Sequence, residues 1–248
     1  MDIIIVGIKG AMGRFVEQSA IARGHNIVAG IDVNVADGET AAYPLYKNFD
    51  NVGRADVIID YSHHTAVKAI LDYAVKTGTP AILCTTGYTE EELAMIKTAS
   101  EKVAVFRSGN MSVGINLLVK LVNEGAKALG KKADVEIVEQ HHHRKVDAPS
   151  GTALMLANAV KSVASDTEFV FGREGLVGKR KPNEVGIHAV RGGTIVGKHE
   201  VIFAMDSEVI TLKHEAESRA VFAEGSIDAA EYMIGKGAGL YDMTDVLG

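Results

Sequence analysis

Short apolar runs rich in β-branched residues alternate with amphipathic segments over the first 106 residues. The runs predict strands at residues 3–6, 26–31, 56–60, 81–84 and 103–106. The segments between them predict helices at residues 12–23, 66–77 and 90–101. Strands that alternate with helices in this way are typical of a parallel sheet that is covered by helices on both faces.

The pattern changes after residue 112. A long amphipathic helix is predicted at residues 113–129 and a second helix at residues 150–163. Strands are predicted at residues 134–140, 168–171, 186–190, 194–203 and 208–214, and a final helix at residues 220–234. We therefore expect an α+β domain with a mixed, open sheet, and we expect the chain end to return to the first domain.

Composition and charge exclude several classes of protein. The net charge of −6 argues against a nucleic-acid partner. No apolar stretch approaches the ~20 residues that a membrane-spanning helix needs. Cys84 is the only cysteine, so no intramolecular disulfide is possible, and the first residues do not resemble a secretory signal peptide. We expect a cytoplasmic protein with no membrane partner.

Three glycines, Gly7, Gly10 and Gly13, lie between the first predicted strand and the first predicted helix. Such a turn lets a pyrophosphate approach bare backbone, where the helix N-terminus offers N–H groups and a positive dipole end. The spacing is G-x-x-G-x-x-G, whereas the common dinucleotide fingerprint would place its first glycine at Ile8. The alternative is a turn that only packs the helix against the strand.

An acidic residue at the end of the second strand favours the dinucleotide interpretation. Asp32 lies where a carboxylate is expected to accept a hydrogen bond from the adenosine ribose. Lys9 and Arg14 flank the turn and can meet phosphate charge. Because Val33 follows Asp32 and no arginine is present for a 2′-phosphate, we expect NADH to be used at least as well as NADPH. The sequence thus predicts a Rossmann-type doubly wound parallel sheet.

Two further loops follow predicted strands, at residues 84–87 and 108–112. The carboxyl ends of strands in a doubly wound sheet form the ligand crevice, so we expect these small and polar residues to contact the nicotinamide half of the cofactor. Cys84 also has a simpler interpretation as a small buried apolar residue.

A histidine-rich segment at residues 139–152 forms the densest positive locus of an acidic protein. His141, His142, His143, Arg144 and Lys145 follow one another and suit an anionic substrate. Histidine can donate a proton near neutral pH, and a lysine close to other cations can also act as an acid. A metal site is a weaker alternative, since only alternate residues of a strand share a face and no set of zinc ligands is evident. We expect no metal.

The residues that follow predict a carboxylate site. Pro149 and Ser150 suit a helix start, and Ser150 can cap it. Gly151 allows an anion to come close to the backbone, and the Thr152 hydroxyl adds a donor. A purely structural helix cap is the alternative.

These motifs together resemble the 4-hydroxy-tetrahydrodipicolinate reductase family over essentially the whole chain. The segments similar to the family's motifs are VGIKGAMGR at 6–14, DYS at 60–62, TTG at 85–87, NMSVGIN at 110–116, EQHHHRKVDAPSGTAL at 139–154, FGREG at 171–175, VRGGTIVGKHEVIF at 190–203 and GLYDMTDVL at 239–247. Two positions depart from the family's pattern. Arg144 stands where the signature commonly has a histidine, and Val33 stands where an arginine often follows the ribose acid.

The resemblance implies hydride transfer from NAD(P)H to the substrate ring, giving tetrahydrodipicolinate in the diaminopimelate route of lysine biosynthesis. It implies that His141 is the general acid and Lys145 a second proton donor. It implies that the dicarboxylate substrate is held by His142, Ser150, Gly151 and Thr152. The cofactor would be lined by Gly7, Ile8, Lys9, Gly10, Ala11, Met12, Gly13, Arg14, Asp32, Cys84, Thr85, Thr86, Gly109, Asn110, Met111 and Ser112.

The resemblance also implies a domain organisation. Residues 1–111 and 222–248 would bind the dinucleotide, and residues 112–221 would bind substrate and join subunits into a homotetramer. Two alternatives remain open at this point. One is another Rossmann dehydrogenase that acts on an amino or hydroxy dicarboxylate, and the other is a nucleotide-sensing protein without turnover.

Overall fold

The computed structural model describes residues 1–248 and divides the chain into two compact units. Unit 1 comprises Met1–Val113 and Arg219–Gly248, and unit 2 comprises Gly114–Ser218. Each unit encloses a hydrophobic core of its own. No helix of either unit is long and apolar enough to cross a membrane.

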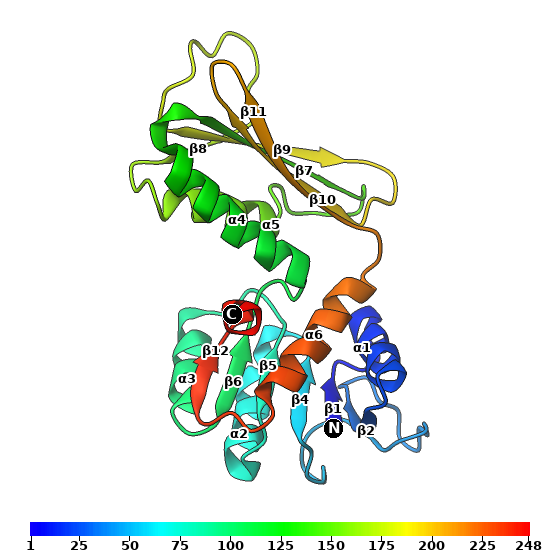
Figure 1. The fold of residues 1–248 in the computed structure, drawn as a ribbon. Coiled ribbons are helices and arrows are strands. Elements are labelled where there is room, and N and C mark those ends of the chain that lie inside the picture. Colours follow the sequence, from blue (N-terminus) through cyan, green and yellow to red (C-terminus); the bar gives the residue numbers. More distant parts are fainter. The chain divides into compact units, whose positions relative to one another are not determined.

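Unit 1 is built on a seven-stranded sheet in the order β12-β6-β5-β4-β1-β2-β3, and every neighbouring pair is parallel (Figure 1). Its strands are β1 (Asp2–Val6), β2 (Asn26–Ile31), β3 (Leu45–Tyr46), β4 (Val57–Asp60), β5 (Ala81–Leu83), β6 (Ala104–Arg107) and β12 (Gly239–Tyr241). The chain runs outward from β1 to β2 and β3, then returns to β4 on the other side of β1. This reversal between β1 and β4 is where a doubly wound sheet opens its ligand crevice.

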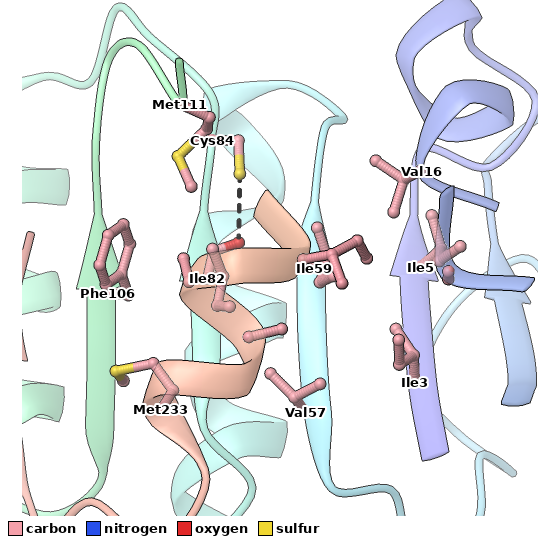
Figure 2. Close-up of a cluster of buried hydrophobic side chains, with 14 of the residues drawn as sticks. Ile3, Ile5, Val16, Val57, Ile59, Ile82, Cys84, Phe106, Met111 and Met233 are labelled. Atoms are coloured by element: carbon pink, nitrogen blue, oxygen red, sulfur yellow. Dashed lines mark hydrogen bonds between the residues drawn. The ribbon is translucent and has the colours of Figure 1, made fainter. Parts of the chain in front are cut away.

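Helices cover both faces of this sheet. Helices α1 (Ala11–Ala22) and α6 (Ala220–Met233) pack on one face, and α2 (Val67–Thr77) and α3 (Glu90–Ser100) pack on the other. The strand side chains alternate accordingly: Ile3 and Ile5 belong to the first core and Ile4 to the second (Figure 2). Because both faces are buried, the strands are continuously apolar, as the sequence pattern predicts. The unit also contains η1 (His64–Ala66) and α7 (Met243–Leu247).

Helix α6 packs closely against the loop after β6 at Gly225. A Cβ atom on Gly225 would overlap the carbonyl oxygen of Met111, so only glycine allows this approach. Ile227 and Met233 then fill the core beside Phe106 and Ile82. Helix α6 therefore packs on a sheet formed mainly by the first 107 residues, although it begins 113 positions after the end of β6.

Unit 2 contains a five-stranded mixed sheet in the order β11-β10-β7-β9-β8. Its strands are β7 (Asp134–His141), β8 (Glu168–Phe171), β9 (Glu184–Arg191), β10 (Gly197–Ala204) and β11 (Val209–Ala216). Strand β7 is antiparallel to β10 and parallel to β9. Helices α4 (Val113–Leu129) and α5 (Gly151–Lys161) cover one face, while η2 (Gly130–Lys132) follows α4 (Figure 1).

The mixed sheet confirms the fold class expected for the second half, although several limits differ. The strand predicted at 194–203 begins at Gly197, because the chain first turns at Gly193, which has a φ of +50°. The helix predicted from residue 150 begins at Gly151, since Ser150 has extended backbone and serves as its cap. Strands β3 and β12 and helix α7 were not predicted, because they are short and none forms an apolar run like that of the three-residue β5.

Candidate functional site

The glycine turn of unit 1 is tightly packed. Gly7 has a φ of +82°, and a Cβ atom there would lie 2.7 Å from the Tyr61 carbonyl oxygen. A Cβ atom on Gly13 would overlap the Gly7 carbonyl oxygen, and the Gly10 N–H donates to that oxygen at 2.9 Å. Packing alone therefore requires glycine at positions 7 and 13.

The same turn leaves the start of helix α1 open. Gly10 precedes the helix and offers no side-chain cap to its first turn, where Ala11 and Arg14 are exposed. Ile8 points into the core and Met12 packs at its edge. A helix start without a side-chain cap presents N–H donors and the positive dipole end, so this backbone fits a pyrophosphate.

Asp32 lies at the edge of a cavity of about 570 Å³ at the carboxyl ends of β1, β2 and β4. Its buried carboxylate accepts hydrogen bonds from the Lys9 N–H at 3.1 Å, the Asn34 N–H at 2.9 Å and the Asn34 side-chain amide at 3.1 Å. Gly7, Gly10 and Val33 line the same cavity. Its other walls are Val6, Ile31, Asn34, Lys47, Asn48, Phe49, Tyr61, Ser62, His63, Thr65, Ala66 and Ala69. Sequence reasoning gave most of these residues no role in cofactor binding, because they are brought together from separate segments by the parallel pairing of β1, β2, β3 and β4.

The Lys9 side chain is already paired. Its ammonium donates to the Asn34 carbonyl oxygen at 3.0 Å and to Glu39 at 2.9 Å. The loop after Asp32 thus supplies a negative partner for the cation that the sequence suggested for phosphate charge.

A buried carboxylate links the loops after β4 and β5. Asp60 accepts hydrogen bonds from the Ser62 N–H at 2.9 Å and hydroxyl at 2.5 Å, and from the Thr85 hydroxyl at 3.4 Å. Burial raises the pKa of Asp60 to about 6, while these hydrogen bonds lower it. The loop residues themselves lie together as expected, since a Cβ atom on Gly109 would be 3.8 Å from the methyl carbon of Thr86.

Two residues of these loops have their side chains in the core. Cys84 and Met111 belong to the cluster that α6 covers (Figure 2). Burial and the nearby Asp60 raise the pKa of the Cys84 thiol well above its ordinary value, so it is no nucleophile and packs as a small apolar residue. Only their backbone atoms are left for a cofactor. Asn110 is fixed in its turn by Ser108, whose hydroxyl donates to the Asn110 carbonyl oxygen at 2.8 Å, and its side chain accepts from the Ser112 N–H at 2.9 Å.

In unit 2, the three histidines of the charged segment occupy different environments. His141 ends β7 on its buried face, His142 is half-buried, and His143 is exposed together with Arg144. The Lys145 ammonium pairs with Asp147 at 2.8 Å. No group of three or more His, Cys, Asp or Glu side chains in the chain is arranged to hold a metal ion.

His141 is joined to a buried carboxylate on its own strand. Glu139 lies two residues earlier, so both side chains share a face, and its oxygen is 2.6 Å from His141 Nδ1. Arg191 donates to both oxygens of Glu139 at 2.8 Å, and the Ser150 N–H donates at 3.0 Å. Burial would raise the pKa of Glu139, but the hydrogen bonds from His141, Arg191 and Ser150 lower it to about 2.

Ser150 caps helix α5 and is itself held by His199. Its hydroxyl accepts from the Ala153 N–H at 3.1 Å and lies 3.0 Å from His199 Nε2. Burial and the nearby His141 lower the pKa of His199 to about 3, so this imidazole is neutral. Gly151 opens the helix, and a Cβ atom there would meet nothing within 4 Å. Protein packing does not require glycine at this position, in contrast to positions 7 and 13.

Sequence reasoning assigned no role to Glu139, Arg191 or His199. The signal for Glu139 was present, since residues two apart in a strand face the same way. Arg191 and His199 come from β9 and β10, and only the pairing of those strands with β7 brings them to the segment.

Two family models match the chain in succession. The model described as "Dihydrodipicolinate reductase, N-terminus" matches residues 1–111, and "Dihydrodipicolinate reductase, C-terminus" matches residues 114–247. The chain belongs to the dihydrodipicolinate reductase family. As a family member it is an NAD(P)H-dependent oxidoreductase of the diaminopimelate route of lysine biosynthesis.

Relatives of this dihydrodipicolinate reductase family match the chain at full length. Two proteins named 4-hydroxy-tetrahydrodipicolinate reductase, from Caldanaerobacter subterraneus subsp. tengcongensis and Clostridium novyi, are each 48% identical over 248 residues. Each alignment covers 99% of this chain and 97% of the relative. The resemblance inferred from the motifs is thereby confirmed.

Solved structures show the same fold at lower identity. A structure described as "Dipicolinate bound Dihydrodipicolinate reductase from Paenisporosarcina sp. TG-14" has a TM-score of 0.80 at 22% identity and covers 99% of this chain and 98% of that chain. A WlbA (WbpB) dehydrogenase from Thermus thermophilus in complex with NAD and UDP-GlcNAcA has a TM-score of 0.56 at 12% identity, covering 99% and 91%. The dihydrodipicolinate reductase architecture thus extends to more distant dehydrogenases.

Proposed function

We propose that His141 and Lys145 supply protons while the chain reduces 4-hydroxy-tetrahydrodipicolinate to tetrahydrodipicolinate. The observation that supports this proposal is the contact of 2.6 Å between His141 Nδ1 and the buried Glu139. An imidazole tied at Nδ1 to an ionised carboxylate keeps Nε2 for proton transfer, which is the arrangement of a general acid. Lys145, paired with Asp147, is the second donor.

The substrate is a dicarboxylate, and the helix start at Ser150 supports a site for one carboxylate. The N–H groups of Gly151 and Thr152 and the Thr152 hydroxyl bind its oxygens, with Ser150 fixing the cap and His142 adding a polar contact. The bare surface at Gly151 leaves room for the anion. Bound NAD(P)H supplies the hydride, and the 4-hydroxyl group of the substrate leaves as water. The cationic segment stabilises the negative charge that develops on the ring until it is protonated.

The cofactor is bound by unit 1, where the glycine turn and the uncapped start of α1 fit a pyrophosphate. Asp32 accepts a hydrogen bond from the ribose, and Thr85, Thr86, Gly109, Asn110 and Ser112 line the nicotinamide end. We propose that NADH is used at least as well as NADPH. The Asp32 carboxylate repels a 2′-phosphate, and Val33 has no charge to bind one. Lys9 is already paired with Glu39, so its ammonium is not available to the phosphate.

We propose further that residues 1–111 and 222–248 form the dinucleotide-binding domain and residues 112–221 the substrate and oligomerisation domain. The face of the mixed sheet opposite α4 and α5 supports subunit contacts within a homotetramer, because Val138, Val190 and Ile202 lie outside the core cluster. A cytoplasmic location is supported by the free thiol of Cys84.

A coupled assay tests the function. The purified chain is mixed with the condensation product of aspartate semialdehyde and pyruvate, and the oxidation of NADH and of NADPH is followed at matched concentrations. We expect turnover that depends on this product. Binding of NADH without turnover would indicate a nucleotide sensor, and turnover with other amino or hydroxy dicarboxylates alone would indicate a different dehydrogenase.

A further inference from the structure

We propose that Glu139 is the positioning residue of the proton donor: it fixes the tautomer and orientation of His141 and ties the donor to the carboxylate-binding turn at Ser150. The inference rests on the proposed role of His141. It adds a residue with no assigned function, fully buried beneath the substrate segment.

Both oxygens of Glu139 are fully engaged. One accepts from His141 Nδ1 at 2.6 Å and Arg191 Nη1 at 2.8 Å, and the other accepts from Arg191 Nη2 at 2.8 Å and the Ser150 N–H at 3.0 Å. An ionised carboxylate has about four acceptor sites, so its capacity is used. A two-pronged arginine contact of this kind fixes the plane of the carboxylate as well as its charge.

This geometry determines which nitrogen of His141 takes part in proton transfer. A carboxylate can only accept, so Nδ1 must carry a hydrogen in both the neutral and the charged imidazole. Nε2 is then the atom that gains and loses the catalytic proton. It faces Gly197, where an added Cβ atom would lie 3.2 Å away, so glycine keeps that side of the ring free of a side chain.

The same carboxylate connects three elements of unit 2. His141 ends β7, Arg191 ends β9, and Ser150 caps α5. Glu139 therefore sets the position of the proton donor relative to the turn that binds the substrate. Arg191 extends the connection, because its Nη2 also donates to the Asp147 carbonyl oxygen at 2.5 Å. The ion pair of Glu139 and Arg191 therefore also holds the loop that carries Lys145.

Charged groups and histidines surround Glu139. Arg191 and Asp147 are charged, Lys145 lies on the same loop as Asp147, and His199 and His214 approach from β10 and β11. Burial lowers the pKa of both His199 and His214, so these two imidazoles stay neutral at neutral pH. His141 is the histidine whose ring hydrogen-bonds to Glu139, beside Arg191.

Strand β7 supplies a matched control. Glu136 also binds two arginines and a histidine, namely Arg173 at 2.8 Å, Arg180 at 3.2 Å and His188 at 2.8 Å. It lies three residues before Glu139, on the opposite face of the strand. Glu136→Gln removes a comparable carboxylate without touching the histidine segment. Because Glu136 lies on the face proposed for subunit contacts, size-exclusion chromatography must show the wild-type assembly for this control.

The kinetic experiment compares Glu139→Gln, Glu139→Asp and Glu136→Gln. We expect Glu139→Gln to lower kcat by about 10²-fold, in the range of a general acid, with unchanged NADH affinity. The alkaline limb of log kcat/KM against pH should move to lower pH, because the protonated donor has lost its carboxylate. Glu139→Asp should recover part of kcat, and Glu136→Gln should behave as wild type. A Glu139→Gln enzyme with the wild-type kcat and pH profile would overturn the proposal.

A spectroscopic experiment tests the tautomer of His141 in the wild-type protein, so its result does not depend on whether a Glu139 variant folds. In protein labelled with ¹⁵N-histidine, the ¹⁵N chemical shifts and the one-bond ¹⁵N–¹H couplings of each imidazole identify its tautomer. The signals that are missing from the spectrum of His141→Gln belong to His141. We expect neutral His141 to carry its hydrogen on Nδ1. A hydrogen on Nε2 would overturn the role of Glu139, whereas wild-type turnover by His141→Gln would overturn the proposed function instead.

Discussion

The rings of His141 and His199 lie edge to face, with centroids 5.1 Å apart and planes at 73°. Two imidazolium ions at this distance would repel, and burial makes the charged form of His199 the costlier one. The two histidines therefore have different partners. His199 remains neutral and holds Ser150, whereas His141 contacts the Glu139 carboxylate.

The neutral state of His199 predicts sensitivity to mild acid. A histidine titrates near 6.5 in an unfolded chain but near 3 here, so below about pH 6.5 the unfolded chain binds the extra proton. Its contribution to stability is complete above that pH, and the free energy of unfolding should fall by about 1 kcal/mol per pH unit below it. Calorimetric Tm values between pH 7 and 4.5 should fall more steeply for wild type than for His199→Gln.

The pH range separates this effect from Glu136 and Glu139, whereas Asp60, whose pKa is raised to about 6, titrates in the same range and is present in both proteins. Glu136 and Glu139 have pKa values lowered to about 2, so their contributions to stability are lost only as the pH falls below about 4.5. His214 titrates in the same direction as His199 but is present in both proteins. Parallel Tm curves for the two proteins would contradict the neutral state of His199.

Replacement of the proposed acid should affect chemistry and leave cofactor binding intact. His141→Gln should lower kcat by ~10²-fold or more, as loss of a general acid does, with little change in NADH affinity. Steady-state kinetics and NADH fluorescence titration measure the two quantities. His143→Gln is the matched control, because this exposed neighbouring histidine belongs to the same segment but is not a proposed proton donor. Equal losses in both variants would point to the charge of the segment.

Gly151→Ala tests the carboxylate site. The added Cβ atom meets no protein atom within 4 Å, and alanine favours a helix over glycine by up to about 1 kcal/mol, so Tm should stay constant or rise. Substrate KM should rise about tenfold, since the methyl group would crowd the anion and weaken a charged hydrogen bond. An unchanged KM in a stable variant would place the carboxylate elsewhere.

Cofactor preference should follow the charges after β2. The double change Asp32→Ser with Val33→Arg should shift the ratio of kcat/KM values towards NADPH by about tenfold or more, because it removes a repelling carboxylate and adds a phosphate partner. Glu39→Gln should act in the same direction more weakly by releasing Lys9. A constant ratio in the double variant would show that the ribose is held away from Asp32.

The sequence alone predicted the parallel sheet, the mixed sheet and the residues with a local signature. Apolar runs reveal buried strands because burial on both faces removes polar positions, and the glycine turn and helix cap are visible because their requirements are local. His141, Ser150 and Gly151 belong to one short segment, so motif and spacing were enough to select them. Strands β3 and β12 were not predicted, because they are short and lack the apolar run that reveals the three-residue β5.

The tertiary structure alone decided how those residues are held. Arg191 and His199 lie 50 or more positions after His141, and the pairing of β9 and β10 with β7 brings them to Glu139 and Ser150. In the same way, tertiary packing decided that Cys84 and Met111 face the core, and the loop after β2 decided that Lys9 pairs with Glu39 on the surface. Local composition determines which elements form. The partners and charges of a buried side chain depend on contacts between distant segments, and no short stretch of sequence contains them.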